Sequence, residues 1–310
     1  MGRHGPTRRR AHTPMSWLTE AFEPNFMRTA LIGALLAVVV CSLVGTWVVL
    51  RGLAFIGDAL AHGVIPGVAL AQIWGLSVVG GAMVSALVMA GGITLVNRRS
   101  RVGDDTAIGL LFVGMLALGV VIISAASARD LTTLLFGSIL GVTAEDVRLL
   151  AVATVIVVVT LVAFHRALLA LTFNRDKAAS LGMRPGLTHA LLMVLVALAV
   201  VASFQAVGTL MVFGLIVAPP ATASLFARRV PTVMVGGVLA GWVAAVGGLV
   251  ISYHFNTAAG ASIAGLSVVL FFIALAAREL AASIGRRSNG TGPNTHPTHA
   301  PGRIHAGHHH

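Results

Sequence analysis

Long apolar runs separated by short polar loops dominate the pattern of hydrophobic and polar positions along this sequence. Each run is close to the about 20 residues that a helix needs to cross a bilayer. The runs cover residues 29–50, 53–74, 76–96, 107–127, 147–166, 187–203, 205–227, 231–253 and 261–281. The pattern predicts an all-α fold: a polytopic transmembrane helix bundle of about nine spans in a lipid bilayer.

Composition and charge agree with a membrane protein. The chain is 57% hydrophobic and 10% charged, with a mean hydropathy of +0.93, whereas soluble domains are about 25% charged. The formal net charge of +11 would suggest a nucleic-acid partner if the basic residues formed a patch. They lie instead at the chain ends and in short loops, where membrane proteins carry positive charge on the cytoplasmic side. We expect a multi-pass protein of a bacterial-type plasma (inner) membrane with no nucleic-acid partner.

The basic loops also predict a topology. Basic residues occur in the loops 97–105, 165–184 and 227–230 and in the tail that begins at Arg278. Two predicted spans separate each of these segments from the next, so all four can face the cytoplasm together. Three spans precede the first basic loop, which places the N-terminus outside despite the arginines at 8–10.

The polar ends of the chain are predicted to lie outside the bundle. Residues 1–26 read as a disordered basic leader, 27–283 as the transmembrane domain and 284–310 as a disordered His-rich tail, because neither end has the apolar content to fold. Histidine-rich tracts bind zinc-like metals. The tail histidines His296, His299 and His305 could therefore bind metal, and plain disordered decoration explains them equally well.

One carboxylate and one imidazole interrupt the second apolar run. Asp58 and His62 are four residues apart, which places both side chains on one face of a helix. An ionised Asp at a bilayer centre costs about 2.5–3.5 kcal/mol on the insertion scale, so it is rarely left facing lipid. Together the two groups suit a divalent metal such as Zn²⁺ or Mn²⁺. A structural hydrogen bond inside the bundle remains the alternative, and two ligands alone leave a metal shell incomplete.

A second candidate element is the loop 174–186. Its sequence predicts a short helix with an acidic first turn, ended by Gly182 and by Pro185. The shape suits docking into a groove on a partner, and a capped connector is the alternative. The residues proposed for docking are Asp176, Lys177, Ala178, Ala179, Leu181 and Gly182.

Prolines inside the apolar runs predict helix breaks. Pro219 and Pro220 are adjacent within one run, and Pro66 lies in another. Proline removes a backbone donor and frees carbonyl groups, and broken helices line the pathway in many transporters. A kink required only by packing is the alternative interpretation.

Several of these motifs together resemble a known family. The run VVLRGLAFIGDALAHGVIPGVALA is similar to the permease subunits of zinc- and manganese-type ABC importers, with Arg51, Asp58 and His62 in the family's places. The resemblance continues through LLFGSILGV, DKAASLGM and VGTLMVFGLIVAPPATA and covers about residues 29–281. It implies a homodimeric permease of the type II importer class, a cytoplasmic ABC ATPase, an external metal-binding protein and a coupling role for the loop helix. It also implies that Asp58 and His62 contact the transported ion.

The resemblance does not decide which metal is transported, and the sequence itself bears on the energy source. The sequence has no phosphate-binding loop with Lys and Ser/Thr, so ATP hydrolysis must come from a partner and the chain is not an enzyme. No permanently bound cofactor is expected. Zn²⁺ is favoured as cargo because of His62 and the His-rich tail, with Mn²⁺ or Fe²⁺ as alternatives. A proton-coupled secondary carrier that uses Asp58 and His62 is the second hypothesis. An intramembrane metalloenzyme is the third, and no His-Glu-x-x-His element supports it.

Overall fold

The computed structural model describes residues 24–99, 103–125, 142–173 and 185–289. All regular structure in these residues is helical, which confirms the predicted all-α bundle. The helices are α2 (Asn25–Leu50), α3 (Phe55–Gly63), α4 (Ile65–Ile73), α5 (Val78–Arg99), α6 (Asp104–Ala125), α8 (Ala144–Ala163), α9 (His165–Phe173), α11 (Pro185–Val207), α12 (Thr209–Ser224), α13 (Val230–Phe255) and α14 (Ala259–Asn289).

Eight helical segments in the described part of the chain are long and apolar enough to cross a membrane, with α3 and α4 together forming one of them. The predicted seventh run, 205–227, differs from the others because it forms only the 16-residue helix α12. At 1.5 Å per residue this helix is about 24 Å long, shorter than the about 30 Å hydrocarbon core. Gly208 starts it with a φ of +79°, a conformation that an apolarity pattern cannot reveal.

The predicted run 53–74 is not one helix, because α3 ends and α4 begins at Val64. Pro66 lies in the first turn of α4, where its missing N–H is tolerated. The hydroxyl of Ser85 on α5 donates a 2.7 Å hydrogen bond to the carbonyl of Gly63. That bond stabilises the junction, since a buried carbonyl without a partner is costly.

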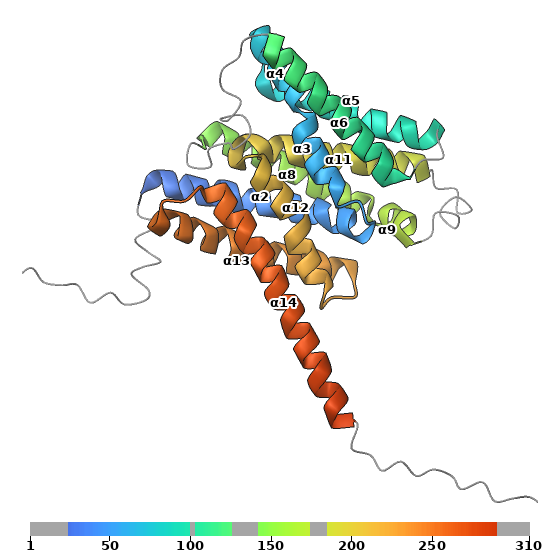
Figure 1. Cartoon of the computed structure of the whole chain (residues 1–310), viewed down its shortest axis with the longest axis vertical. Coiled ribbons are helices and arrows are strands. Elements are labelled where there is room, and N and C mark those ends of the chain that lie inside the picture. Colours follow the sequence, from blue (N-terminus) through green and yellow to red (C-terminus); the bar gives the residue numbers. More distant parts are fainter. Residues whose placement is uncertain (1–23, 100–102, 126–141, 174–184, 290–310) are drawn as a thin grey trace, which may run out of the picture.

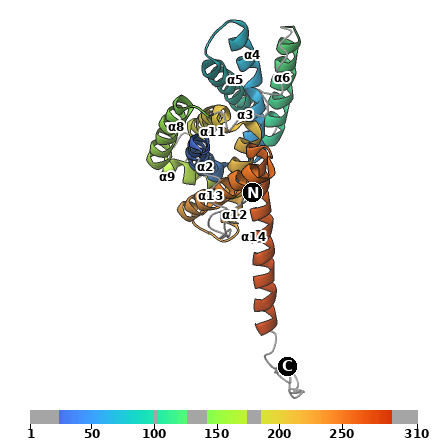
Figure 2. The ribbon, with the colours of Figure 1, turned by 90° about the vertical axis from the view of Figure 1, so that its left-hand side faces the viewer.

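Helix α2 lies at the centre of the bundle, packed between α8 and α11 on one side and α12 and α13 on the other (Figure 1, Figure 2). A Cβ atom on its Gly45 would stand only 2.0 Å from the backbone oxygen of Ile216 on α12. Pro220, four residues after Ile216, has no N–H to bond that oxygen. The carbonyl that the proline frees therefore lies directly against the glycine of α2.

The break predicted at Pro219 and Pro220 is not present, because α12 runs through both prolines and ends at Ser224. Both prolines pack toward glycines of α13. A Cβ on Gly237 would lie 3.3 Å from Cα of Pro220, and one on Gly241 would lie 3.5 Å from Cβ of Pro219. These close approaches stabilise the helix without a break, as neighbouring helices commonly do for membrane prolines.

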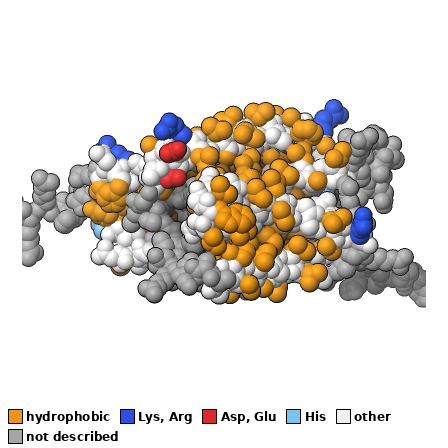
Figure 3. All heavy atoms as spheres, turned by 90° about the horizontal axis from the view of Figure 1, so that it is seen from above, with side chains coloured by type: hydrophobic (Ala, Val, Ile, Leu, Met, Phe, Trp, Pro, Cys, Tyr) orange, Lys and Arg blue, Asp and Glu red, His pale blue; other side chains and the backbone are white. Residues whose placement is uncertain are grey.

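The helix ends agree with the predicted common side of the basic loops. The end of α5, α9 and the start of α11 lie at one end of the bundle, together with the α12–α13 connection, and the starts of α2 and α8 lie at the other (Figure 1). Apolar side chains cover the middle of the face in Figure 3, and Lys and Arg side chains lie toward its two ends. This is the distribution expected of a bundle that crosses a bilayer.

Helix α14 leaves the bundle after its first turns and projects away from it (Figure 1, Figure 2). Exposed apolar side chains of this helix include Val269, Phe272 and Ile273. The helix continues to Asn289, past the boundary predicted at residue 283. The leader up to residue 23 and the tail from residue 290 lie outside the described residues.

Candidate functional site

Asp58 and His62 lie on the only open stripe of α3. Every residue of this helix is buried except Phe55, Asp58 and His62, which are spaced i, i+3 and i+7 and therefore share one face. The His62 Nε2 atom is 3.5 Å from the Asp58 Oδ1 atom, and the two side chains are 27% and 30% exposed. The pairing predicted from the four-residue spacing is therefore present in the fold.

Close packing on the other faces of α3 fixes the direction of this stripe. A Cβ on Gly57 would lie 3.3 Å from the side chain of Ile216 on α12. Ile56 and Leu60 are fully buried, and α6 and α11 also contact the helix. Because a close-packed interior leaves its helices little freedom to shift, α3 holds its two polar side chains in one orientation.

The imidazole of His62 has one nitrogen committed and one available. Nε2 faces Asp58, while Nδ1 is buried and has no hydrogen-bond partner among the described residues. The ring lies against Phe112 of α6, with ring centroids 5.8 Å apart. A buried ring nitrogen without a partner is costly in apolar surroundings, and a neutral imidazole offers a lone pair at that atom. The site therefore suits a ligand that accepts a nitrogen donor, as a divalent metal ion does.

The described residues of one copy provide too few ligands for a complete shell. Within the described residues no group of three or more His, Cys, Asp or Glu side chains could hold a metal ion. The cysteine Cys41 is buried on α2 and contacts Ser203. Asp58 and His62 supply one oxygen and one nitrogen, and these two ligands alone leave a metal shell incomplete.

The structure brings only part of the predicted set to this place. Pro66 is buried one turn beyond His62, in the first turn of α4. Pro219 and Pro220 face α13, as described above. The predicted docking residues of 176–182 and the tail histidines lie outside the described residues. Phe112 and Ser85 carry no signal in the sequence, because a single Phe or Ser in an apolar run does not reveal its neighbour.

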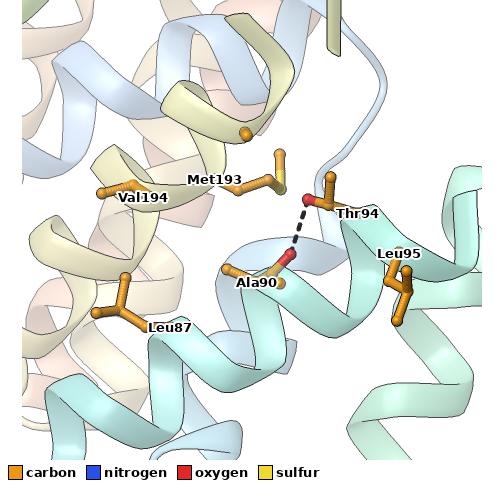
Figure 4. Close-up of a pocket in the computed structure, with 8 residues that line it drawn as sticks. Leu87, Ala90, Thr94, Leu95, Met193 and Val194 are labelled. Carbon is orange, nitrogen blue, oxygen red and sulfur yellow. Dashed lines mark hydrogen bonds between the residues drawn. The ribbon is translucent and has the colours of Figure 1, made fainter. Parts of the chain in front are cut away.

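Two grooves among the described residues, one between α5 and α11 and one between α12 and α14, are lined by residues other than Asp58 and His62. A groove of about 300 Å³ lies between α5 and α11, with Leu87, Ala90, Thr94 and Leu95 on one wall and Met193 and Val194 on the other (Figure 4). The Thr94 hydroxyl is bonded to the carbonyl of Ala90 within its own helix. An apolar groove of this kind suits a hydrocarbon chain and offers nothing to an ion.

Most helices of this bundle are long enough to cross a membrane, and α3 leaves open only the stripe that carries Asp58 and His62. Because polar groups inside a membrane mark substrate pathways, these features define a multi-span permease. Comparison with known proteins makes this class specific. Residues 23–278 match the ABC 3 transport family, and the chain belongs to this family.

The chain is also similar to membrane proteins of manganese and iron transport systems. The chain is 34% identical over 261 residues to the manganese transport system membrane protein MntC of Listeria monocytogenes, covering 84% of this chain and 93% of the relative. It is 38% identical over 250 residues to the manganese import system permease protein ScaB of Streptococcus gordonii, covering 80% and 90%. A probable iron transport system membrane protein of Haemophilus influenzae is 33% identical over 261 residues, covering 84% and 96%.

The solved structure of PsaBC from Streptococcus pneumoniae in complex with Fab has a TM-score of 0.75 at 35% identity, covering 84% of this chain and 95% of that chain. A second structure, an inward-facing metal-chelate type ABC transporter, has a TM-score of 0.61 at 15% identity and shares the fold alone. The chain is thus the membrane permease subunit of a bacterial ABC metal importer. ATP is hydrolysed by a separate subunit, and a substrate-binding partner serves the importer.

Proposed function

We propose that this permease carries Mn²⁺ into the cytoplasm and that Asp58 and His62 are the side chains that contact the ion in transit. The observation that carries the proposal is the open stripe of α3, with its available imidazole nitrogen. Mixed oxygen and nitrogen ligands without thiolate suit Mn²⁺ and Fe²⁺ as well as Zn²⁺. Manganese is preferred because two of the relatives above carry manganese in their names. The argument for zinc rests partly on the His-rich tail, which lies outside the described residues.

Two copies of the chain supply the path in this proposal. One copy offers two ligands, and no third metal-binding side chain joins them in the part that the structure describes. A two-fold axis that brings two α3 stripes face to face would supply two carboxylates and two imidazoles. The segment 176–182 is proposed to dock the ATPase, and an external metal-binding protein is proposed to deliver the ion. An ATP-driven family makes the proton-coupled carrier the weaker alternative.

The test of the site is cellular metal content. Manganese, zinc and iron are measured by mass spectrometry in cells that express the complete importer in metal-limited medium. His62→Ala and Asp58→Ala are each expected to lower manganese accumulation by at least about 10- to 100-fold, the range that loss of an outer-shell partner already costs a metal site. The matched histidine control is His254→Ala. His254 lies in the last turn of α13, at the end of the bundle away from the basic loops.

The outcomes separate the alternatives. A selective fall in zinc or iron would reassign the cargo and keep the site. Unchanged levels of all three metals, at equal amounts of protein, would show that the pair is structural and would overturn the proposal.

The shared path has its own test. Phe55 is 66% exposed and lies on the same stripe as the metal pair, so Phe55→Cys is expected to cross-link two copies through a short bifunctional reagent. The matched control is Leu110→Cys, which is 65% exposed on α6. The native Cys41 is buried and serves as an unreactive background. Equal cross-linking at both positions would contradict facing stripes.

A further inference from the structure

A polar contact joins two distant segments at the basic end of the bundle. Nη2 of Arg51 lies 3.2 Å from Nδ1 of His189, across 138 positions of sequence. A guanidinium can only donate, so Nδ1 of His189 is the acceptor in this contact. His189 is 7% exposed, and an apolar environment strengthens a charge-assisted bond of this kind.

A second contact lies one helical turn away. The ring of Trp47 meets the ring of His165 edge to face, with centroids 5.6 Å apart and planes at 70°. Trp47 and Arg51 are four residues apart, so they share one face at the end of α2. The end of α2 therefore contacts both α9, through His165, and α11, through His189.

These two partner helices flank the segment proposed to dock the ATPase. Helix α9 ends at Phe173 and α11 begins at Pro185. His165 opens α9, and His189 lies just over one turn into α11. The chain enters the intervening segment from α9 and leaves it into α11.

The residues that follow Arg51 lead directly into α3, the helix that carries Asp58 and His62. Arg51 ends α2 and starts a tight turn in which Gly52 has a φ of +68° and Leu53 N–H donates to the carbonyl of Val48. Helix α3 follows at Phe55, so Asp58 is seven positions beyond Arg51. A turn this short and this well bonded has little slack, and movement of Arg51 moves the start of α3.

We propose that the Arg51–His189 contact is a positioning pair that transmits movement of the ATPase-docking segment to the helix that carries Asp58 and His62. The inference rests on the proposed function of that segment and of that pair. Neither residue touches the ion. The bond fixes the first turns of α11 to the α2–α3 turn, so that the two move as one unit when the segment between α9 and α11 is displaced.

A matched contact separates transmission from simple packing. Cys41 and Ser203 also join α2 to α11, with Sγ and Oγ 3.5 Å apart, and both residues are buried. That contact lies near the far end of α11 from the docking segment. Its loss should affect packing between the same two helices without interrupting the path from the segment to α3.

The test uses the complete importer in proteoliposomes, with its ATPase and binding protein. Uptake of Mn²⁺ and hydrolysis of ATP are measured in the same vesicles. His189→Leu removes the acceptor and is expected to lower the number of ions moved per ATP by about fivefold or more, the lower limit of a typical coupling between sites. His189→Gln retains an acceptor and is expected to recover most of that ratio, while Ser203→Ala leaves it unchanged.

A double variant guards against a folding defect. Arg51→Met combined with His189→Leu replaces both hydrogen-bonding partners by apolar side chains of similar size, a change that can be nearly neutral for stability. It should lower the ratio no further than the more severe single variant, because both changes remove the same contact. A normal ratio in His189→Leu or in the double variant would overturn the proposal. Because His62→Ala tests the metal site with Arg51 and His189 intact, failure of the site and failure of the transmission are distinguishable.

Discussion

The α3–α4 segment and helix α6 lie side by side, yet they show opposite relations between apolarity and burial. The segment Phe55–Ile73 has the lowest mean hydropathy of the eight candidate spans, 1.3, and 67% of its most apolar stretch is buried. Residues Asp105–Ser124 of α6 have the highest, 2.7, and only 28% is buried. In a soluble protein the more apolar helix would be inside. In a bilayer the more apolar helix faces the lipid, and small and polar residues lie at the contacts between helices.

The largest test of this comparison concerns glycines on the two helices. A Cβ on Gly67 of α4 would lie 2.0 Å from the backbone oxygen of Gly81 on α5, whereas a Cβ on Gly114 of α6 would meet nothing within 4 Å. Gly67→Ala must separate two helix backbones and is expected to cost about 3 kcal/mol, the upper end for overpacking. Gly114→Ala should change stability by less than about 0.5 kcal/mol, as surface substitutions do.

The measurement is thermal unfolding in detergent, followed by circular dichroism at equal protein concentration. Gly81→Ala provides a second reading of the same crossing, since its Cβ would lie 2.3 Å from the oxygen of Gly67. Equal midpoints for the variants at 67 and 114 would show that α4 and α5 do not approach as closely as the structure has them.

The helical character of these segments and the Asp58–His62 pair were predictable from local patterns. Apolar length alone predicts membrane helices, and a four-residue spacing alone places two side chains on one face. The 3.5 Å separation of Asp58 and His62 confirms that prediction. Information of this kind is contained in a short stretch of chain and does not depend on tertiary contacts.

Features that depend on distant contacts were not predictable. The run 53–74 is apolar on both sides of Val64, so hydropathy does not distinguish one helix from two. The prolines of α12 suggest a break, yet close glycines on α13 make a continuous helix stable. Which of many interchangeable Phe and Leu side chains meets His62 is decided by packing across the bundle, and Phe112 is 50 positions away.

The junction between α3 and α4 gives a test of intermediate size. Ser85→Ala removes the donor to the buried carbonyl of Gly63 and is expected to cost about 1–2 kcal/mol, since that oxygen loses its partner away from water. Thr94→Val, also on α5, is the control. The Thr94 hydroxyl donates to the Ala90 carbonyl of its own helix, which retains its backbone hydrogen bond after the substitution.

Chemical unfolding in mixed micelles measures both variants of α5. If Ser85→Ala and Thr94→Val lower the stability equally, the hydroxyl at 85 has no special role at the junction. If only Ser85→Ala lowers it, the break at Val64 is stabilised from the neighbouring helix.

The smallest expected effect lies where the two regions meet. Phe112 is the residue of α6 whose ring contacts the imidazole of His62, although most of its neighbours on that helix are exposed. Phe112→Ala removes a ring contact of about 0.5–1 kcal/mol, which corresponds to about a two- to fivefold change in an equilibrium constant. We expect the KM for metal uptake to rise by that amount, because the ring contact that holds the imidazole of His62 is lost. Val113→Ala, at 63% exposure, removes an adjacent lipid-facing side chain and should leave KM unchanged. A similar rise in both variants would mean that α6 affects uptake through its general packing, and that the ring at 112 does not position His62.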